Sequence, residues 1–334
     1  MTTSVGRPGL GIASWLGLFI GLGIAVALVA WQGLDRLASL LASTRWTLIL
    51  VTGFAVPLLV LAAVSWRLLF PPGRPPRFAL ILAALWIGFS INVLLPVASI
   101  GGDVVRARLL ALWSVKTRDA VASVVVDKTV QVATLPLLGL IGIAALLRVV
   151  PDAASLGAAF GGVILLATVL AVLVVVQRAG LFGFLASRAV RLGRRFNSED
   201  LVGRAGDLDD AIRRLYSRPA RIVASCGLRV LARLSLSGEV WLAARLLGHP
   251  ITPVEAILLQ SFGTVIRTAA FPVPAGLGVQ EGTFVALGSL IGLPADVALA
   301  TSLATRIREI VSGVPGLIAW EYVEGRALWR RRAA

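Results

Sequence analysis

Charged side chains lie inside long apolar stretches of this sequence, and their types and spacing could bind a charged ligand. Arg106 stands three residues after Asp103, and Glu309 stands three residues after Arg306, so each pair can share one face of a helix. A charged group near the centre of a bilayer costs about 2.5–3.5 kcal/mol to insert, so it usually faces a partner or a polar cavity. These residues could therefore pair with one another or line a site for an anion.

The first of these two interpretations is internal ion pairing, since a buried charge needs a partner. It would join Asp103 with Arg106, Asp127 with Lys128 or an arginine, and Glu309 with Arg306. The second is a polar cavity whose surplus arginines bind an anionic or hydroxylated lipid headgroup, because the planar guanidinium donates two parallel hydrogen bonds to a phosphate. The candidate headgroup-binding residues are Asn92, Gly101, Gly102, Asp103, Arg106, Arg229, Arg233, Arg267, Gly276, Gly278, Glu281 and Arg306. Further candidates for lining the cavity are Asp127, Lys128, Gln131, Glu239 and Glu309.

Two breaks rich in Pro and Gly interrupt apolar helices close to these charges. Gly101 and Gly102 could offer free backbone N–H groups to an anion, as helix N-termini do. In residues 272–282, two prolines restrict helix formation and two glycines permit an unusual turn. Glu281 begins the helix that follows, where a carboxylate favours the positive end of the dipole. The alternatives for Glu281 are this helix-start role and a contact with an intramembrane arginine or a headgroup hydroxyl.

The sequence shows no catalytic or metal-binding constellation. A single histidine, His249, and a single cysteine, Cys226, exclude the usual zinc clusters. Neither a P-loop nor a dinucleotide-binding glycine fingerprint is present. We therefore expect no metal, no cofactor and no catalytic residues. Whether the protein is an enzyme is left open, and the absence of such a constellation favours a protein that is not one.

The composition indicates a membrane protein. Of the 334 residues, 57% are hydrophobic and 15% are charged, against roughly 25% charged in soluble domains. The mean hydropathy is +0.89, which argues against both a soluble globular chain and a disordered one. The net charge of +15 comes from residues that lie largely between apolar runs, so we interpret it as basic cytoplasmic loops rather than a nucleic-acid site.

The elements that must position these residues are membrane-spanning helices of about 20 apolar residues each. Six segments meet this description: residues 10–31, 46–70, 119–147, 157–177, 220–247 and 297–320. Two further apolar regions, 78–113 and 254–293, contain the Pro/Gly breaks, and broken helices in matching positions of two halves are typical of transporter binding sites. The predicted fold is an all-α polytopic integral membrane protein with six full spans and two broken, re-entrant helical hairpins in an inverted-repeat arrangement.

Basic residues set the predicted topology. Lys and Arg concentrate on one side when the N-terminus is placed inside and each hairpin returns to the side it came from. We therefore expect cytoplasmic N- and C-termini and one membrane domain, 1–334. Its parts are a first half at 10–177, a basic cytoplasmic connector at 178–219, a second half at 220–325 and a basic tail at 326–334. The connector would lie on anionic lipid or dock a partner.

The two breaks carry a family resemblance. Two sets of residues resemble signatures of the flippase-like membrane domain of lysylphosphatidylglycerol synthases. The first is residues 92–96 (NVLLP) with 101–106 (GGDVVR), and the second is residues 276–282 (GLGVQEG) with Arg306 and Pro315-Gly316. Residues 97–110 and 123–128 look closest to the branch associated with hopanoid biosynthesis. The resemblance implies a bacterial inner-membrane protein with a lipid-handling role. It also implies a stand-alone member, since no aminoacyl-transferase domain follows the last span in this sequence.

The leading functional hypothesis is a lipid transporter or flippase for a polar-headgroup, isoprenoid or hopanoid lipid, linked to hopanoid or envelope lipid biosynthesis. The expected partners are membrane lipids such as an anionic phospholipid, an isoprenoid phosphate or a hopanoid. The alternatives are a membrane-embedded headgroup transferase and a non-catalytic scaffold for lipid-biosynthesis enzymes. The oligomeric state is left open.

Overall fold

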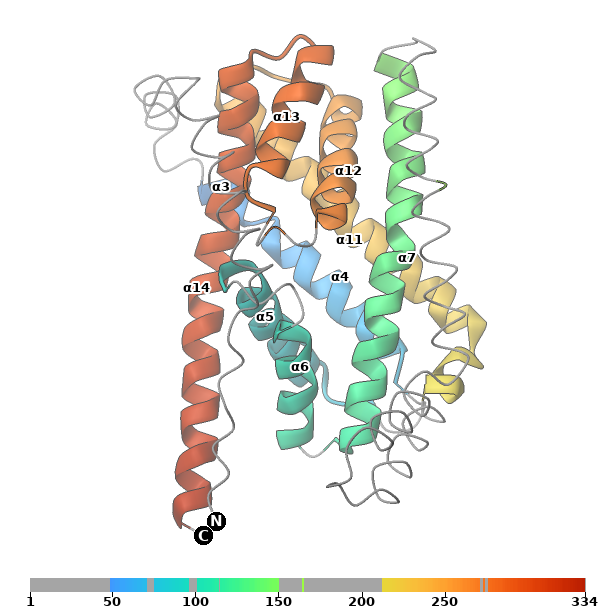
Figure 1. Cartoon of the computed structure of the whole chain (residues 1–334), viewed down its shortest axis with the longest axis vertical. Helices are drawn as coiled ribbons and strands as arrows, with labels where there is room; N and C mark the ends of the chain where they lie inside the picture. The colour runs from blue at the N-terminus through green and yellow to red at the C-terminus, as the bar shows by residue number, and fades with distance from the viewer. Residues whose placement is uncertain are drawn as a thin grey trace, which may run out of the picture.

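The computed structural model of the chain describes residues 49–70, 75–95, 101–113, 115–149, 164, 212–270, 273 and 276–333 (Figure 1). These residues form helices and turns, without a β-strand among them. The span expected at 10–31, the span expected at 157–177 apart from residue 164, and most of the connector 178–219 lie outside the described residues. The predicted all-helical fold is therefore confirmed for the described part of the chain.

The described helices cover apolar segments of the sequence, and α14 continues past the expected span 297–320 to Ala333. Pro219 opens α11, and Pro253 opens α12 behind a capping box in which Thr252 and Glu255 bond to each other's backbone N–H groups. The bounds are α3 Ile49–Thr52, α4 Ala55–Leu68, α5 Phe78–Leu94, α6 Gly101–Leu112, α7 Thr117–Val149, α11 Pro219–Leu246, α12 Pro253–Ala269, α13 Val279–Leu290 and α14 Ala295–Ala333.

Within the described part of the chain, two segments are long and apolar enough to cross a membrane by themselves. They are Ile49–Leu68, which comprises α3 and α4, and Thr117–Val149, which is α7. The α11 and α14 helices are also long, with 28 and 39 residues, but charged residues recur along both. Six full spans thus stay a prediction, because those charges lower the hydropathy of two expected spans and two others fall outside the described residues.

The two segments with Pro/Gly breaks each form two helices joined by a break. α5 and α6 pack against each other on either side of residues 95–100, and α12 and α13 do so on either side of residues 270–278. Figure 1 shows the α5–α6 pair in the lower half of the molecule and the α12–α13 pair in the upper half. Their arrangement as re-entrant hairpins of an inverted repeat stays a prediction.

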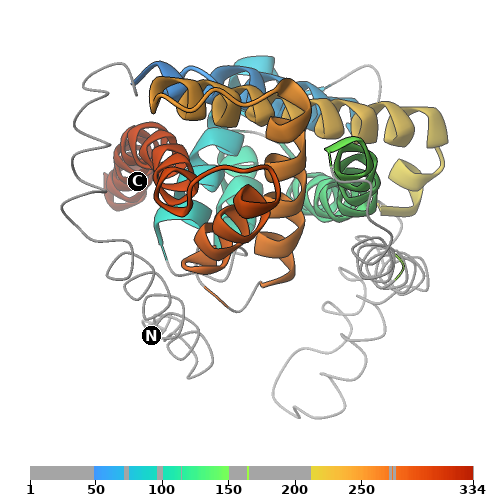
Figure 2. The same cartoon turned by 90° about the horizontal axis from the view of Figure 1, so that it is seen from above.

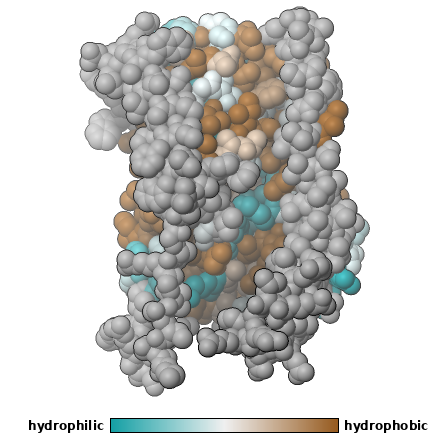
Figure 3. Space-filling model, in the orientation of Figure 1, coloured by the Kyte–Doolittle hydropathy of each residue, from teal (hydrophilic) through white to brown (hydrophobic). Residues whose placement is uncertain are grey.

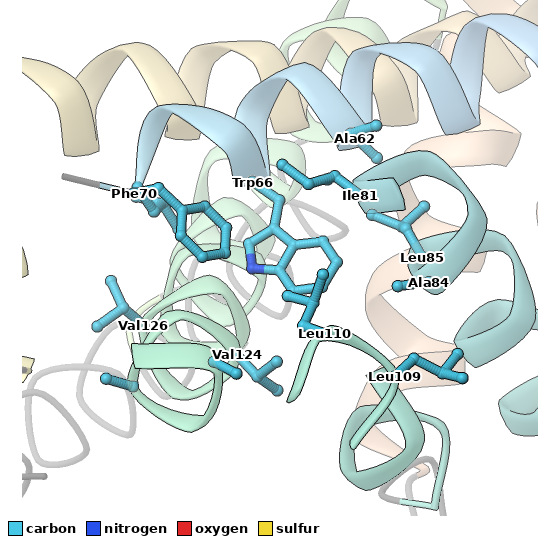
Figure 4. Packing of buried hydrophobic residues seen from close by; sticks show 14 of the residues in the cluster. Ala62, Trp66, Phe70, Ile81, Ala84, Leu85, Leu109, Leu110, Val124 and Val126 are labelled. Atoms are coloured by element: carbon cyan, nitrogen blue, oxygen red, sulfur yellow. The ribbon is translucent and has the colours of Figure 1, made fainter. Parts of the chain in front are cut away.

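The two larger hydrophobic cores lie in these two halves. In the lower core, the fully buried Trp66 of α4 lies among Ile81 and Leu85 of α5, Leu110 of α6 and Val124 of α7 (Figure 4). The upper core joins α11, α12, α13 and the first turns of α14. Seen from above, α4 and α11 lie side by side as a back layer behind the other helices (Figure 2).

The long helix α14 contacts both halves. Its N-terminal part packs on α13, and further along it packs on α5. There the indole Nε1 of Trp86 donates to the carbonyl oxygen of Ser312 at 2.7 Å. Close contact needs small residues, since a Cβ on Gly316 would lie 2.0 Å from the hydroxyl of Ser90. A single helix therefore joins the two broken pairs.

Candidate functional site

Buried charges of α6, α7 and α11 form a first ion-pair network in the lower half. The carboxylate of Asp127, which is fully buried, accepts from Arg106 and from Arg229 at 2.5 Å each. Asp103 pairs with Arg106 at 3.1 Å and with Lys128 at 2.9 Å. Three cations therefore share two carboxylates, which leaves this network with an excess positive charge.

Aromatic and amide groups complete the first network. The guanidinium of Arg106 lies 4.0 Å from the ring centroid of Trp66, a cation–π distance. Gln131 donates its amide to Asp127 at 2.9 Å. The Nε atoms of Arg106 and Arg229 are buried without a hydrogen-bond partner in the described structure. Two buried donors of this network thus lack a hydrogen-bond partner among the described residues.

Charges of α12, α13 and α14 form a second ion-pair network in the upper half. Arg306 pairs with Glu281 and with Glu309 at 3.0 Å each. Arg267 reaches Glu309 at 2.5 Å and also donates to the amide oxygen of Gln280 at 2.8 Å. The network therefore ties both arms of the second broken pair to α14.

A further pair connects this network to α11. Arg308 of α14 donates to Glu239 at 2.7 Å, and both side chains are almost fully buried. Nη1 of Arg308, Oε1 of Glu239 and Oε2 of Glu281 have no partner among the described residues. Buried polar atoms of this kind are rare in packed interiors, so the second network also keeps unused hydrogen-bonding capacity.

The second break brings backbone into the polar centre. Gly276 has φ +60° and Gly278 has φ +76°, a region that favours glycine. The carbonyl oxygen of Gly276 accepts from Arg306 at 3.3 Å, and a Cβ there would lie 2.5 Å from Cγ of Arg267. These glycines thus let the break lie directly against two arginines.

The glycines of the first break serve close helix packing. A Cβ on Gly102 would lie 2.0 Å from the carbonyl oxygen of Gly88, so α5 and α6 touch through their backbones. The N–H of Gly102 donates to the side-chain oxygen of Asn92 at 2.8 Å. Gly88 in turn makes room for Arg106, whose Cγ would lie 2.4 Å from an added Cβ. Asn92 and Gly102 therefore fix the helix that carries Asp103 and Arg106.

Arg233 stands between the two networks. It lies one helical turn from Arg229 on α11, and the charges of Arg229, Arg267, Arg308 and Glu309 all act on it. Its side chain is half-buried and makes neither a salt bridge nor a hydrogen bond with any residue described in the structure. In this region seven cations face five carboxylates, so Arg233 lies in a surplus of positive charge.

The whole of this arrangement falls within one match to a known family. A model of the lysylphosphatidylglycerol synthase transmembrane region matches residues 18–316. The chain belongs to this family. Neither the comparison with curated proteins nor the comparison with solved structures gave a match.

The lysylphosphatidylglycerol synthase transmembrane region is a helical membrane domain associated with lipid handling. Membership confirms the resemblance found in the sequence and makes the chain a membrane protein. Assignment to the hopanoid-associated branch, which the match does not separate from the rest of the family, stays a prediction.

The structure brings the predicted site residues of this family member into two groups rather than one cavity. Asn92, Gly101, Gly102, Asp103, Arg106, Asp127, Lys128, Gln131 and Arg229 belong to the first network or its supporting break. Arg267, Gly276, Gly278, Glu281, Arg306, Glu309 and Glu239 belong to the second. Arg233 lies between the two groups, and charges of both groups act on its guanidinium.

Three residues of the networks were missing from the sequence-based set: Trp66, Gln280 and Arg308. Arg308 follows Arg306 by two residues, so it points to a different side of α14 and leaves the stripe that spacing identifies. The sequence offers one indication for Gln280, its position directly before Glu281. At the start of α13 both side chains contact α14, where Gln280 donates to Ser302 and Thr305 and Glu281 pairs with Arg306. Trp66 lies near the end of the apolar segment 46–70, a position typical of tryptophans at a membrane interface, yet it is fully buried.

The carboxylates of the site are engaged with cations. Asp103, Asp127, Glu239, Glu281 and Glu309 each pair with at least one arginine. In the described part of the chain, no group of three or more His, Cys, Asp or Glu could hold a metal ion. The arrangement is thus chemically suited to binding an anion through guanidinium groups.

Proposed function

We propose that this protein is a lipid transporter of the flippase type that moves an anionic lipid headgroup past Arg233. The observation that carries the proposal is that Arg233 is half-buried, has no pairing partner among the described residues and lies in a surplus of positive charge. An unpaired cation in a membrane protein is costly. A phosphate or similar headgroup would remove that cost by supplying the missing partner.

The two networks support a pathway on either side of Arg233. They lie in opposite halves of the molecule and each is built on one broken helix pair. Among the residues that Figure 3 colours, hydrophilic ones show at mid-height beside hydrophobic ones, and further hydrophilic ones show in the lower half. A headgroup could therefore exchange one set of arginines for the other while its tail stays in lipid, as the broken helices of transporters allow.

The charges at the two ends of the molecule support an orientation in the membrane. Where α4 and α6 finish and α5, α7 and α11 begin, the lower end of Figure 1, the charges are predominantly basic. The basic members are Arg67, Arg77, Arg108, Lys116, Arg118, Arg213, Arg214, Arg218 and Arg221, against Asp119 and Glu324. The opposite end carries Arg148 and Arg245 against Glu255 and Asp296. In our proposal the basic end and the C-terminus face the cytoplasm of a bacterial inner membrane.

The test is transport by purified protein in liposomes. Fluorescent phosphatidylglycerol, an isoprenoid phosphate, a hopanoid and zwitterionic phosphatidylcholine would be compared by chemical quenching of the outer leaflet. We expect faster movement of at least one anionic probe than of phosphatidylcholine. Arg233→Gln should slow it about ten-fold or more, the worth of a charge-assisted hydrogen bond.

Arg245→Gln is the matched control, because Arg245 is an exposed arginine at the end of the same helix, against Trp241. It should transport at the rate of the unmodified protein. Absence of movement for every probe by folded protein, or an equal loss in both variants, would refute the proposal.

A further inference from the structure

A cavity of about 140 Å³ lies at the basic end, apart from both networks. It is enclosed by the end of α4, the first two turns of α7, the start of α11 and the segment before it. Three arginines line it, Arg214, Arg218 and Arg221, together with the hydroxyl-bearing Ser123 and Ser217. Apolar side chains from the end of α4 complete the wall, so the cavity is both cationic and apolar.

The arginines of this cavity have capacity to bind a ligand. The side chains of Arg214 and Arg218 are exposed and pair with nothing in the part of the chain that the structure describes. Arg221 donates one N–H to the carbonyl oxygen of Phe70 at 3.2 Å, which holds its guanidinium at the wall. The acidic lining residue, Asp119, lies 3.7 Å from Arg118 outside the cavity. Three cations thus face one carboxylate.

The cavity is separated from the mid-depth pathway. Arg221 and Arg233 are twelve residues apart on α11, about 18 Å along the helix. Between them, the hydroxyls of Ser65 and Ser225 meet at 2.7 Å and both side chains are fully buried. Trp66, which donates to Ser123 at 3.3 Å, closes the way to Arg106. A ligand in this cavity would therefore lie off the pathway past Arg233.

We propose that this cavity binds the phosphate group of an anionic phospholipid held as a resident lipid. Guanidinium groups and the nearby N-termini of α7 and α11 supply the positive potential that a phosphate needs. The apolar wall from α4 suits the start of an acyl chain. Basic pockets between helices at the cytoplasmic side commonly hold lipid headgroups. The proposal is independent of transport through Arg233.

The test counts lipids that stay bound to purified protein in native mass spectrometry, in an Arg233→Gln background that removes the transport site. Phosphatidylglycerol and phosphatidylcholine would be titrated separately, and inorganic phosphate would be added as a competitor. One arginine near an anionic headgroup contributes about five-fold in affinity. The double variant Arg214→Gln/Arg218→Gln should therefore raise the phosphatidylglycerol concentration for half occupancy about 30-fold.

Arg213→Gln is the control, because Arg213 is an exposed neighbour that does not line the cavity. We expect it to keep the affinity of its parent. Equal loss in the control and the double variant, or equal binding of the two phospholipids, would overturn the proposal. Displacement of phosphatidylglycerol by an equal concentration of inorganic phosphate would show a site for free phosphate and would overturn the lipid assignment.

Discussion

Two buried carboxylates each pair with arginines that come from different helices. Asp127 joins Arg106 of α6 to Arg229 of α11, and Glu309 joins Arg267 of α12 to Arg306 of α14. Removal of one partner from a buried pair leaves an uncompensated charge in a low-dielectric surrounding. Each of these carboxylates therefore stabilises contacts between separate helices.

Asp127→Asn should lower the free energy of unfolding by about 3–5 kcal/mol, because two buried arginines lose their shared partner. Thermal unfolding of the detergent-solubilised protein, followed by tryptophan fluorescence, measures the change. Asp119→Asn on the same helix is the control, since the Asp119 side chain is 34% exposed. It should change stability by less than about 0.5 kcal/mol. A mild effect of Asp127→Asn would show that the network contributes little to the fold.

Arg233→Gln should leave the free energy of unfolding unchanged or raise it by up to about 2 kcal/mol. The reason is that the substitution removes an unpaired cation from among like charges. The same unfolding measurement applies. Arg229→Gln on the same helix should instead destabilise the protein, since Arg229 pairs with Asp127 at 2.5 Å. A loss of stability in Arg233→Gln equal to that in Arg229→Gln would mean that Arg233 has a structural partner.

Local spacing predicts part of this chemistry. The pairs Asp103–Arg106 and Arg306–Glu309 follow from positions three residues apart, and the structure shows both. Asp127 pairs with Arg106 and Arg229 rather than with Lys128, because adjacent residues on a helix point in different directions. The contact between Asp127 and Arg229 spans 102 residues, and no spacing rule reaches that far.

Among the helices, the two broken pairs are the distinctive feature. The Pro/Gly breaks predict both interruptions, since the expected regions 78–113 and 254–293 contain α5 with α6 and α12 with α13. The sequence does not predict how closely the arms approach, because Gly102 resembles a phosphate-binding glycine as readily as a packing glycine. The clash of an added Cβ with the Gly88 carbonyl favours packing.

Gly102→Ala should destabilise the protein by about 1–3 kcal/mol, because the new methyl group meets backbone, which cannot rotate away. Gly227→Ala on α11 is the matched variant, because an added Cβ there meets nothing within 4 Å. It should be neutral or stabilising by about 0.5–1 kcal/mol. Both are measured by thermal unfolding, and equal effects would contradict the close approach of α5 and α6.

In the molecule as a whole, the two larger hydrophobic cores lie in opposite halves of the long axis, and the two ion-pair networks lie on either side of Arg233 between them. The composition predicts a membrane protein, and the family match confirms it. Which helices meet could not be predicted, because helix–helix packing depends on shapes of surfaces that one sequence does not reveal. The contact of α14 with α5 is such a case.

Cysteine labelling tests the proposed orientation. In a Cys226→Ser background, Ser217→Cys places a thiol at the basic end and Ser289→Cys places one at the opposite end, both at exposed positions. With a membrane-impermeant maleimide on spheroplasts, we expect labelling of Ser289→Cys before lysis and of Ser217→Cys only after it. The reverse pattern would invert the topology.

The contact between α5 and α14 also has a consequence for how the protein is made. The bond from Trp86 to Ser312 joins residues 226 positions apart, and Gly316 fills the space beside Ser90. A ribosome releases α5 long before α14, so one side of α5 waits uncovered through most of translation. This part of the assembly therefore finishes only when α14 arrives, and until then that side of α5 is open to a membrane chaperone or a quality-control protease.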